Sequence, residues 1–117
     1  MDHKIIVREK KEIDHDQVEY ILNKNFGENR HQRTVYLYRK KSPIKGLSLV
    51  SCLNEDPKTV IGTITFYRTL VSNINCILLG PLAVSDVFQG KGFGKILVRK
   101  GLEIAKLKNE TICFVSG

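Results

Sequence analysis

Hydrophobic residues in the last third of the chain form two runs, and the segment between them has hydrophobic residues at helical spacing. One run covers residues 76–84 and the other residues 112–115, with a glycine-rich turn at residues 89–94 and an amphipathic stretch up to Asn109 between them. Short apolar runs are typical of buried strands, and a 3.6-residue period indicates a helix. The positions predicted on one helix face are Phe93, Ile96, Leu97, Leu102 and Ala105. The order predicts a strand, a glycine loop, a helix and a second strand parallel to the first, joined by a right-handed crossover.

The first third of the chain predicts a short strand at residues 5–7 and then a helix. Asp14 is the predicted N-cap and Gln17 its capping-box partner, while Ile13 and Val18 are placed to form a hydrophobic staple. Helical spacing continues through Val18, Ile21, Leu22 and Phe26, and Gly27 is the expected end of the helix.

The middle of the chain predicts a meander. Residues 47–53 and 60–69 alternate like strands around a polar turn at residues 54–58, which indicates a hairpin, and residues 76–84 supply the third strand. Residues 28–45 fit either a strand or a second short helix. Pro81 has no backbone N–H, so it predicts a bulge or an end of pairing within the third strand.

Composition places few limits on function. The 117 residues, 42% hydrophobic and 26% charged, predict a single domain over residues 1–117 with a modest core. No apolar stretch approaches the roughly 20 residues that span a bilayer, and the first residues lack a signal-peptide core, so we expect a cytoplasmic protein. Cys52, Cys76 and Cys113 are expected to be buried free thiols. His3 and His15 have no partner at ligand spacing, so no metal site is expected.

The net charge of +7 arises from clusters at residues 8–11, 39–41 and 91–108. Such clusters fit nucleic acid, an acidic membrane surface, a polyanionic small molecule or simply a solvated face. The position of the last cluster favours a small anionic ligand. Its cations flank the glycine loop and the start of the following helix, and they are Lys91, Lys95, Arg99 and Lys100.

The glycine loop itself predicts an anion site. Gly90, Gly92 and Gly94 leave backbone N–H groups unobstructed at a helix start, where the helix dipole also favours negative charge, although a tight turn alone would explain the same glycines. A phosphate-binding P-loop would need Ser or Thr after Gly90-Lys91, and a dinucleotide fingerprint would need glycine in place of Lys95.

The pattern Gln89-x-x-Gly92-x-Gly94, preceded by residues 82–84 and followed by Leu97, resembles motif A of the GNAT superfamily of N-acetyltransferases. The resemblance implies an α+β (α/β) fold with a twisted mixed sheet. Its fourth and fifth strands would splay apart near Pro81, and acetyl-coenzyme A (acetyl-CoA) would lie in the gap.

The same resemblance implies roles for individual residues. The backbone of Leu82, Ala83 and Val84 would bind the pantetheine arm, and one of these N–H groups would polarise the acetyl carbonyl. Backbone amides of the loop would hold the pyrophosphate, with Lys91, Lys95 or Arg99 available to the remaining phosphate. The loop residues concerned are Gln89, Gly90, Lys91, Gly92, Phe93, Gly94 and Lys95. The implied activity is acetyl transfer from acetyl-CoA to a primary amine, the acceptor being a small molecule or a protein.

The resemblance leaves the catalytic residues open. In the family a tyrosine on a helix after the fifth strand often protonates the thiolate, whereas this chain ends at Gly117 and its tyrosines all precede the loop. We therefore also expect a truncated acetyltransferase, a homodimer that completes the sheet, or a catalytically silent coenzyme A binding module. The only candidates for a general base are Glu28, His31, Glu55 and Asp56.

A further alternative is a small basic RNA-binding domain. The bases of the bound RNA would stack on Tyr36, Tyr38, Phe66 and Tyr67, although no ribonucleoprotein signature accompanies these residues.

Overall fold

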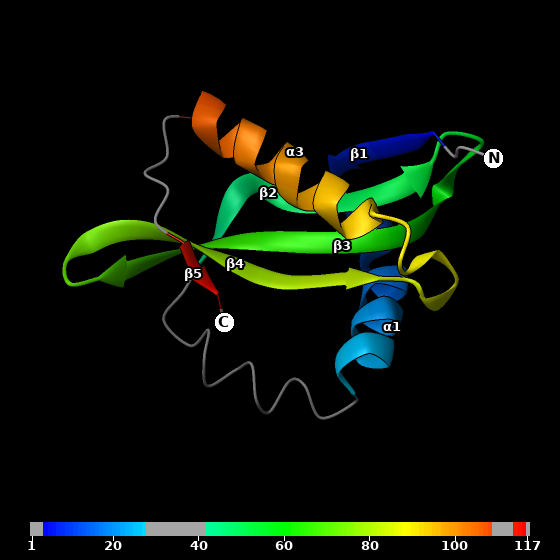
Figure 1. Cartoon of the computed structure of the whole chain (residues 1–117), viewed down its shortest axis with the longest axis horizontal. Helices are drawn as coiled ribbons and strands as arrows, with labels where there is room; N and C mark the ends of the chain where they lie inside the picture. Colours follow the sequence, from blue (N-terminus) through cyan, green and yellow to red (C-terminus); the bar gives the residue numbers. More distant parts are fainter. Residues whose placement is uncertain (1–3, 28–41, 109–113, 117) are drawn as a thin grey trace.

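Five strands form one mixed sheet in the computed structural model, which describes residues 4–27, 42–108 and 114–116. The strands are β1 (Ile5–Glu9), β2 (Ser42–Leu53), β3 (Asp56–Val71), β4 (Ile74–Val84) and β5 (Phe114–Ser116), in that spatial order. Neighbours from β1 to β4 run antiparallel, and β5 runs parallel to β4 (Figure 1). The predicted α+β fold with a meander and a parallel crossover is confirmed.

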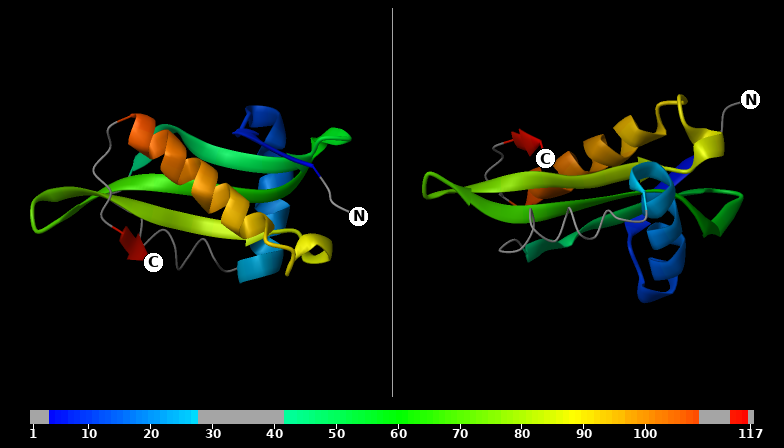
Figure 2. Two further views of the ribbon diagram at one scale, coloured as in Figure 1. Left: turned by 45° about the horizontal axis from the view of Figure 1, so that its top comes forward. Right: turned by 90° about the horizontal axis from the view of Figure 1, so that it is seen from below.

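Two of the described helices cover opposite faces of this sheet. Helix α1 (His15–Phe26) lies on one face and α3 (Phe93–Leu107) on the other (Figure 2). Short 3-10 helices, η1 (Glu12–Asp14) and η2 (Asp86–Phe88), precede them. Successive strand residues point to opposite faces, so Leu49 packs in the α3 layer while its neighbour Val50 packs in the α1 layer.

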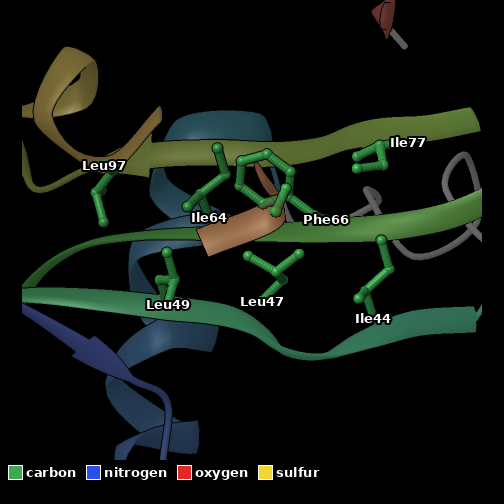
Figure 3. Close-up of a cluster of buried hydrophobic side chains, with 8 residues drawn as sticks. Ile44, Leu47, Leu49, Ile64, Phe66, Ile77 and Leu97 are labelled. Carbon is green, nitrogen blue, oxygen red and sulfur yellow. The ribbon is translucent and has the colours of Figure 1, made fainter. Parts of the chain in front are cut away.

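The α3 layer of the core is built around Phe66 (Figure 3). Its ring is fully buried and lies directly against Gly101 of α3, where an added Cβ would overlap ring carbons. The other buried members are Ile44, Leu47, Leu49, Ile64, Ile77, Leu97 and Ala105. The glycine at the point where α3 passes over Phe66 therefore lets the helix approach the sheet closely.

Strand β4 carries the bulge that Pro81 predicts. Opposite β3, the register steps from Ile64 paired with Leu82 to Phe66 paired with Leu79, which leaves Gly80 and Pro81 facing one residue. On its other side β4 pairs with β5 only over residues 77–79. Within the described residues, the last part of β4 is therefore an open sheet edge.

The predicted start of α1 is right in position but wrong in mechanism. Asp14 is the N-cap residue, yet its side chain makes no capping bond within α1. Its carboxylate instead accepts hydrogen bonds from Arg8 of β1 at 2.7 and 2.9 Å and from the Lys11 N–H at 2.7 Å. Gln17 binds the backbone of β3 rather than the helix start, and Ile13 is 82% exposed, so neither the capping box nor the staple forms at α1.

Two other differences from the prediction concern the residue at which β2 begins and the exposure of two helix side chains. Strand β2 begins at Ser42 rather than at residue 47, and its register with β3 shifts between Pro43 and Ser48. Ile44 and Leu47, which lie within this irregular segment, are both buried. Phe26 and Ile96, which the helical spacing places on the same faces as buried residues, are 41% and 37% exposed.

Several expectations fall outside the described part of the chain. The open choice for residues 28–45 lies mostly there, as do Cys113 and the predicted helix end at Asn109. The buried free thiols of Cys52 and Cys76 are confirmed.

Candidate functional site

Along the last part of β4, the backbone N–H and C=O groups of every second residue point toward the open edge of the sheet. The Ser85 N–H donates to the Ile61 carbonyl at 2.8 Å, and the Ala83 carbonyl also faces β3, 3.3 Å from the Cβ position of Gly62. Because backbone polar groups alternate in direction along a strand, those of Leu82 and Val84 point away from β3. They lie on the side where pairing with β5 has already ended.

The loop after β4 needs glycine at two positions. Gly90 and Gly92 have φ angles of +78° and +81°, a left-handed conformation that costs little only without a Cβ. No atom lies within 4 Å of a Cβ built on either residue, so both face open space. Both residues also line the groove described below.

Helix α3 begins at this loop with its N-terminus open. Gly92 is the N-cap, no side chain caps the helix, and its first turn contains no acidic residue. The N–H groups of the first turn have no partner inside a helix, and the helix dipole adds partial positive charge there. Gly94 brings α3 close to the strand, its Cβ position lying 3.4 Å from the Leu82 side chain.

A groove of about 770 Å³ joins the strand edge to this helix start. Lys95 and Arg99, one helical turn apart, place two cations along it, while Val98 and Leu102 continue it as an apolar wall toward the middle of α3. The remaining lining residues are Asn25, Leu82, Val84, Phe88, Gln89, Gly90, Gly92, Phe93 and Gly94. The groove therefore has a cationic, N–H-rich end and an apolar end.

The structure places the predicted coenzyme residues around this groove, with two exceptions. Ala83 is buried in the α1 layer, and its carbonyl faces β3. Lys91 lies outside the lining, with its Nζ 5.9 Å from the centroid of the Phe88 ring.

Asn25 is a groove residue that sequence reasoning missed. It lies near the end of α1, and its Nδ2 donates to the carbonyls of Ile21 at 2.9 Å and Val84 at 3.2 Å. The Gln89 side chain also donates to the Val84 carbonyl, at 3.0 Å. No local pattern signals this meeting, because 64 residues separate Asn25 from Gln89.

No candidate general base lies in the groove among the described residues. Glu55, on the turn between β2 and β3, and Asp56, the first residue of β3, are both exposed, and Glu28 and His31 lie outside the described part of the chain. The described lining contains no carboxylate, histidine, cysteine or tyrosine.

Two further observations bear on the other function classes. Phe66 is fully buried, so it is not the base-stacking residue that the RNA-binding alternative requires. Among the described helices, none combines the length and the apolar character needed to cross a bilayer.

Another groove, of about 910 Å³, lies between the start of α1 and the bulge of β2. Its walls carry charges of both signs, such as Glu9, Lys10 and Asp16. It lacks the glycine loop and the open N-terminus of α3.

Comparison with solved structures identifies acetyltransferases of the same fold. A GNAT family acetyltransferase from Brucella melitensis, in complex with acetyl-CoA, superposes with a TM-score of 0.73 at 21% identity, over 99% of this chain and 78% of that one. The GNAT family N-acetyltransferase YhbS from Escherichia coli, in complex with CoA, gives 0.74 at 21% identity, over 98% and 64%. An acetyltransferase from Trypanosoma brucei gives 0.69 at 14% identity, over 97% and 82%.

Comparison of sequences gives the family directly. No curated protein sequence matches the chain. The pattern of the Acetyltransferase (GNAT) family matches residues 15–115, which include both helices, strands β2 to β4 and the glycine loop. The chain therefore belongs to the GNAT family of acetyltransferases.

Proposed function

We propose that this chain is an acetyl-CoA-dependent N-acetyltransferase, formed by a single domain over residues 1–117, and that the groove between β4 and α3 binds the acetyl-CoA. One observation carries the proposal: the groove connects an unpaired strand edge to an uncapped helix N-terminus. An elongated ligand with an amide-rich arm and a polyphosphate matches these two ends. The coenzyme A bound to similar structures from Brucella melitensis and Escherichia coli agrees with this choice.

The polyphosphate end fits the residues around the loop. The open N–H groups at the start of α3 donate to phosphate oxygens, and the left-handed glycines keep side chains out of the way. Lys95 and Arg99 lie on the same side of α3 and neutralise negative charge at this end.

The arm end fits the strand edge. Leu82 and Val84 direct backbone groups toward the groove and can pair with an extended amide chain as a strand would. Ala83 has no part in this pairing, because its carbonyl faces β3. A free N–H at this edge is also a donor for the oxyanion that forms when an amine attacks a thioester. Acetyl-CoA supplies that thioester; the acetyl group passes to the amine, and the released thiolate takes up a proton.

Calorimetric titration with acetyl-CoA tests the binding site. We expect saturable binding by the wild-type chain and loss of binding in Gly92→Glu, because a carboxylate would then occupy the anion end. Gly92→Ala is the matched control, since it has the same backbone strain without the added charge and length, and we expect it to retain most of the affinity. Equal binding by Gly92→Glu and the wild type would contradict the proposal.

A catalytically silent coenzyme A binding module is the second candidate. It is favoured by the lack of a proton acceptor among the described residues of the groove. Thiol release from acetyl-CoA, measured with and without a panel of primary amines, separates the two. Release that depends on an amine supports the transferase, whereas tight binding without any amine-dependent release supports the silent module.

A further inference from the structure

Two amide side chains meet on the last carbonyl of β4. Asn25 Nδ2 donates to the Val84 carbonyl at 3.2 Å and Gln89 Nε2 donates to it at 3.0 Å. A carbonyl oxygen has two lone pairs, so this pair of donors saturates it. The Val84 carbonyl is therefore not available to a ligand, although the Val84 N–H still points along the open edge.

The two amides also bind each other. Gln89 Nε2 lies 3.3 Å from Asn25 Oδ1 and 3.5 Å from a carboxylate oxygen of Asp86. Since Asn25 Nδ2 already donates to the Ile21 and Val84 carbonyls, its Oδ1 is the atom left to accept from Gln89. This network joins the end of α1, the end of β4 and the first residue of the glycine loop.

Asn25 and Gln17 both join α1 to the sheet through side-chain amides. Near the start of the helix, Gln17 accepts from the Val60 N–H at 2.9 Å and donates to the Lys58 carbonyl at 3.0 Å, both in β3. Gln17 therefore attaches the helix to β3 alone. Asn25 attaches it at the point where β4 passes into the loop.

We propose that Asn25 is a positioning residue for coenzyme binding. By holding the Val84 carbonyl together with Gln89, it sets the spacing between the strand edge that receives the pantetheine arm and the loop that receives the phosphates. A single ligand that contacts both ends binds well only if this spacing is already in place, because ordering a mobile loop costs affinity. The inference rests on the proposed function and assigns α1 a role in it.

The test compares Asn25→Asp with Gln17→Ala. Asn25→Asp keeps the shape of the side chain and removes the donor to Val84, but it also adds a negative charge at the groove, so binding is measured at high salt, where that charge is screened. Gln17→Ala removes the side-chain hydrogen bonds between α1 and β3. We expect Asn25→Asp to raise the Kd for acetyl-CoA by about 5- to 30-fold, the effect of losing one to two hydrogen bonds. Gln17→Ala should lower the Tm but leave the Kd within about 2-fold, because it does not touch the loop.

Two further measurements complete the design. Because Asn25 and Gln89 act as one unit, the Asn25→Asp/Gln89→Ala double variant should bind acetyl-CoA not much more weakly than the worse single variant. Backbone 15N relaxation without ligand should show greater mobility at Gly90 and Gly92 in Asn25→Asp than in the wild type or Gln17→Ala.

The outcomes separate the two proposals. If the wild type fails to bind acetyl-CoA, the proposed function is wrong, and loop mobility alone then decides whether Asn25 positions the loop. If Asn25→Asp lowers only the Tm and leaves both the Kd and the loop mobility unchanged, Asn25 is merely structural and the inference is overturned.

Discussion

Gly101 shows how strongly one missing methyl group determines the packing of this protein. Phe66 occupies the space that a Cβ on Gly101 would need, and the ring is fully buried. Helix propensity alone favours alanine over glycine by about 1 kcal/mol, so the expected gain from Gly101→Ala is opposed by steric overlap in the core.

We expect Gly101→Ala to lower the free energy of unfolding by about 1–3 kcal/mol, because the Phe66 ring has no open space into which to move. Chemical denaturation measures the change. Gly94→Ala is the matched control in the same helix, since its Cβ would lie at ordinary contact distance, 3.4 Å from Leu82, and we expect it to be neutral or slightly stabilising. A stabilised Gly101→Ala variant would contradict this account of the core.

At the scale of elements, the start of α3 is the feature that makes an anion site. The helix supplies open N–H groups and a dipole, and its first two turns supply Lys95 and Arg99 on one side. Lys100 follows Arg99 in sequence, and both residues line a smaller hollow beside the first strand, where Lys100 Nζ lies 3.9 Å from a carboxylate oxygen of Glu103. Of these two neighbouring cations, Arg99 also lines the groove and Lys100 does not.

We expect Arg99→Ala to weaken acetyl-CoA binding by about 5- to 20-fold at low ionic strength, with a smaller effect at high salt. Lys100→Ala removes the same charge from the next residue and should change the Kd by less than about 2-fold. Calorimetric titration at two salt concentrations measures both. If the two variants weaken binding equally, net charge rather than the groove is responsible.

At the scale of the whole molecule, the pair between Arg8 and Asp14 joins the first strand to the start of α1. The two terminal nitrogens of the Arg8 guanidinium contact the Asp14 carboxylate, and the Asp14 side chain is 2% exposed. The hydrogen bond from Arg8, and then that from the Lys11 N–H, lower the pKa of Asp14 from its usual 3.8 to about 2 despite its burial. The same contact raises the pKa of Arg8, and burial raises the pKa of the neighbouring Cys52 thiol.

A lowered carboxylate pKa stabilises the folded state above the unfolded-state pKa, and this contribution disappears as the pH falls from about 4 to about 2. We expect Asp14→Asn to lower the free energy of unfolding by about 1–3 kcal/mol at pH 7 and by much less near pH 2. Urea denaturation at several pH values measures the difference, with Asp16→Asn, an exposed carboxylate on the same helix, as the control. If Asp14→Asn lowered the free energy of unfolding by the same amount at every pH, the ion pair with Arg8 would not be the source of the lost stability.

Local chemistry made several features predictable. Pro81 lacks an N–H and marks a bulge in the pairing of its strand with β3. The glycines between an apolar run and an amphipathic stretch indicate a loop that leads into a helix. The parallel crossover follows from chain order, because a strand, helix and strand in one sheet connect in a right-handed sense. These signals lie within a few residues of their effects, so sequence patterns report them well.

The surroundings of α1 could not be predicted in the same way. Asp14 and Gln17 have the right residue types for a capping box, but their polar atoms find partners on β1 and β3 instead. Asn25 likewise carries no local signal, since its partners Val84 and Gln89 belong to distant parts of the chain. The strand register decides which of these groups meet.

Local sequence patterns were therefore enough to predict the α+β class, the order of elements from β2 to α3 and the position of the glycine loop. They also predicted the opening of the sheet at Pro81, because these features depend on residues close in the chain. The pairing of Asp14 with Arg8, the packing of Phe66 on Gly101 and the contact of Asn25 with Val84 became evident only in the folded chain. Phe66 and Gly101, like Asn25 and Val84, belong to segments far apart in the chain, and they become neighbours only after the sheet has assembled and the helices have packed on its two faces. Arg8 and Asp14 are only six residues apart, but their pairing depends on how β1 and the start of α1 are placed by the same sheet.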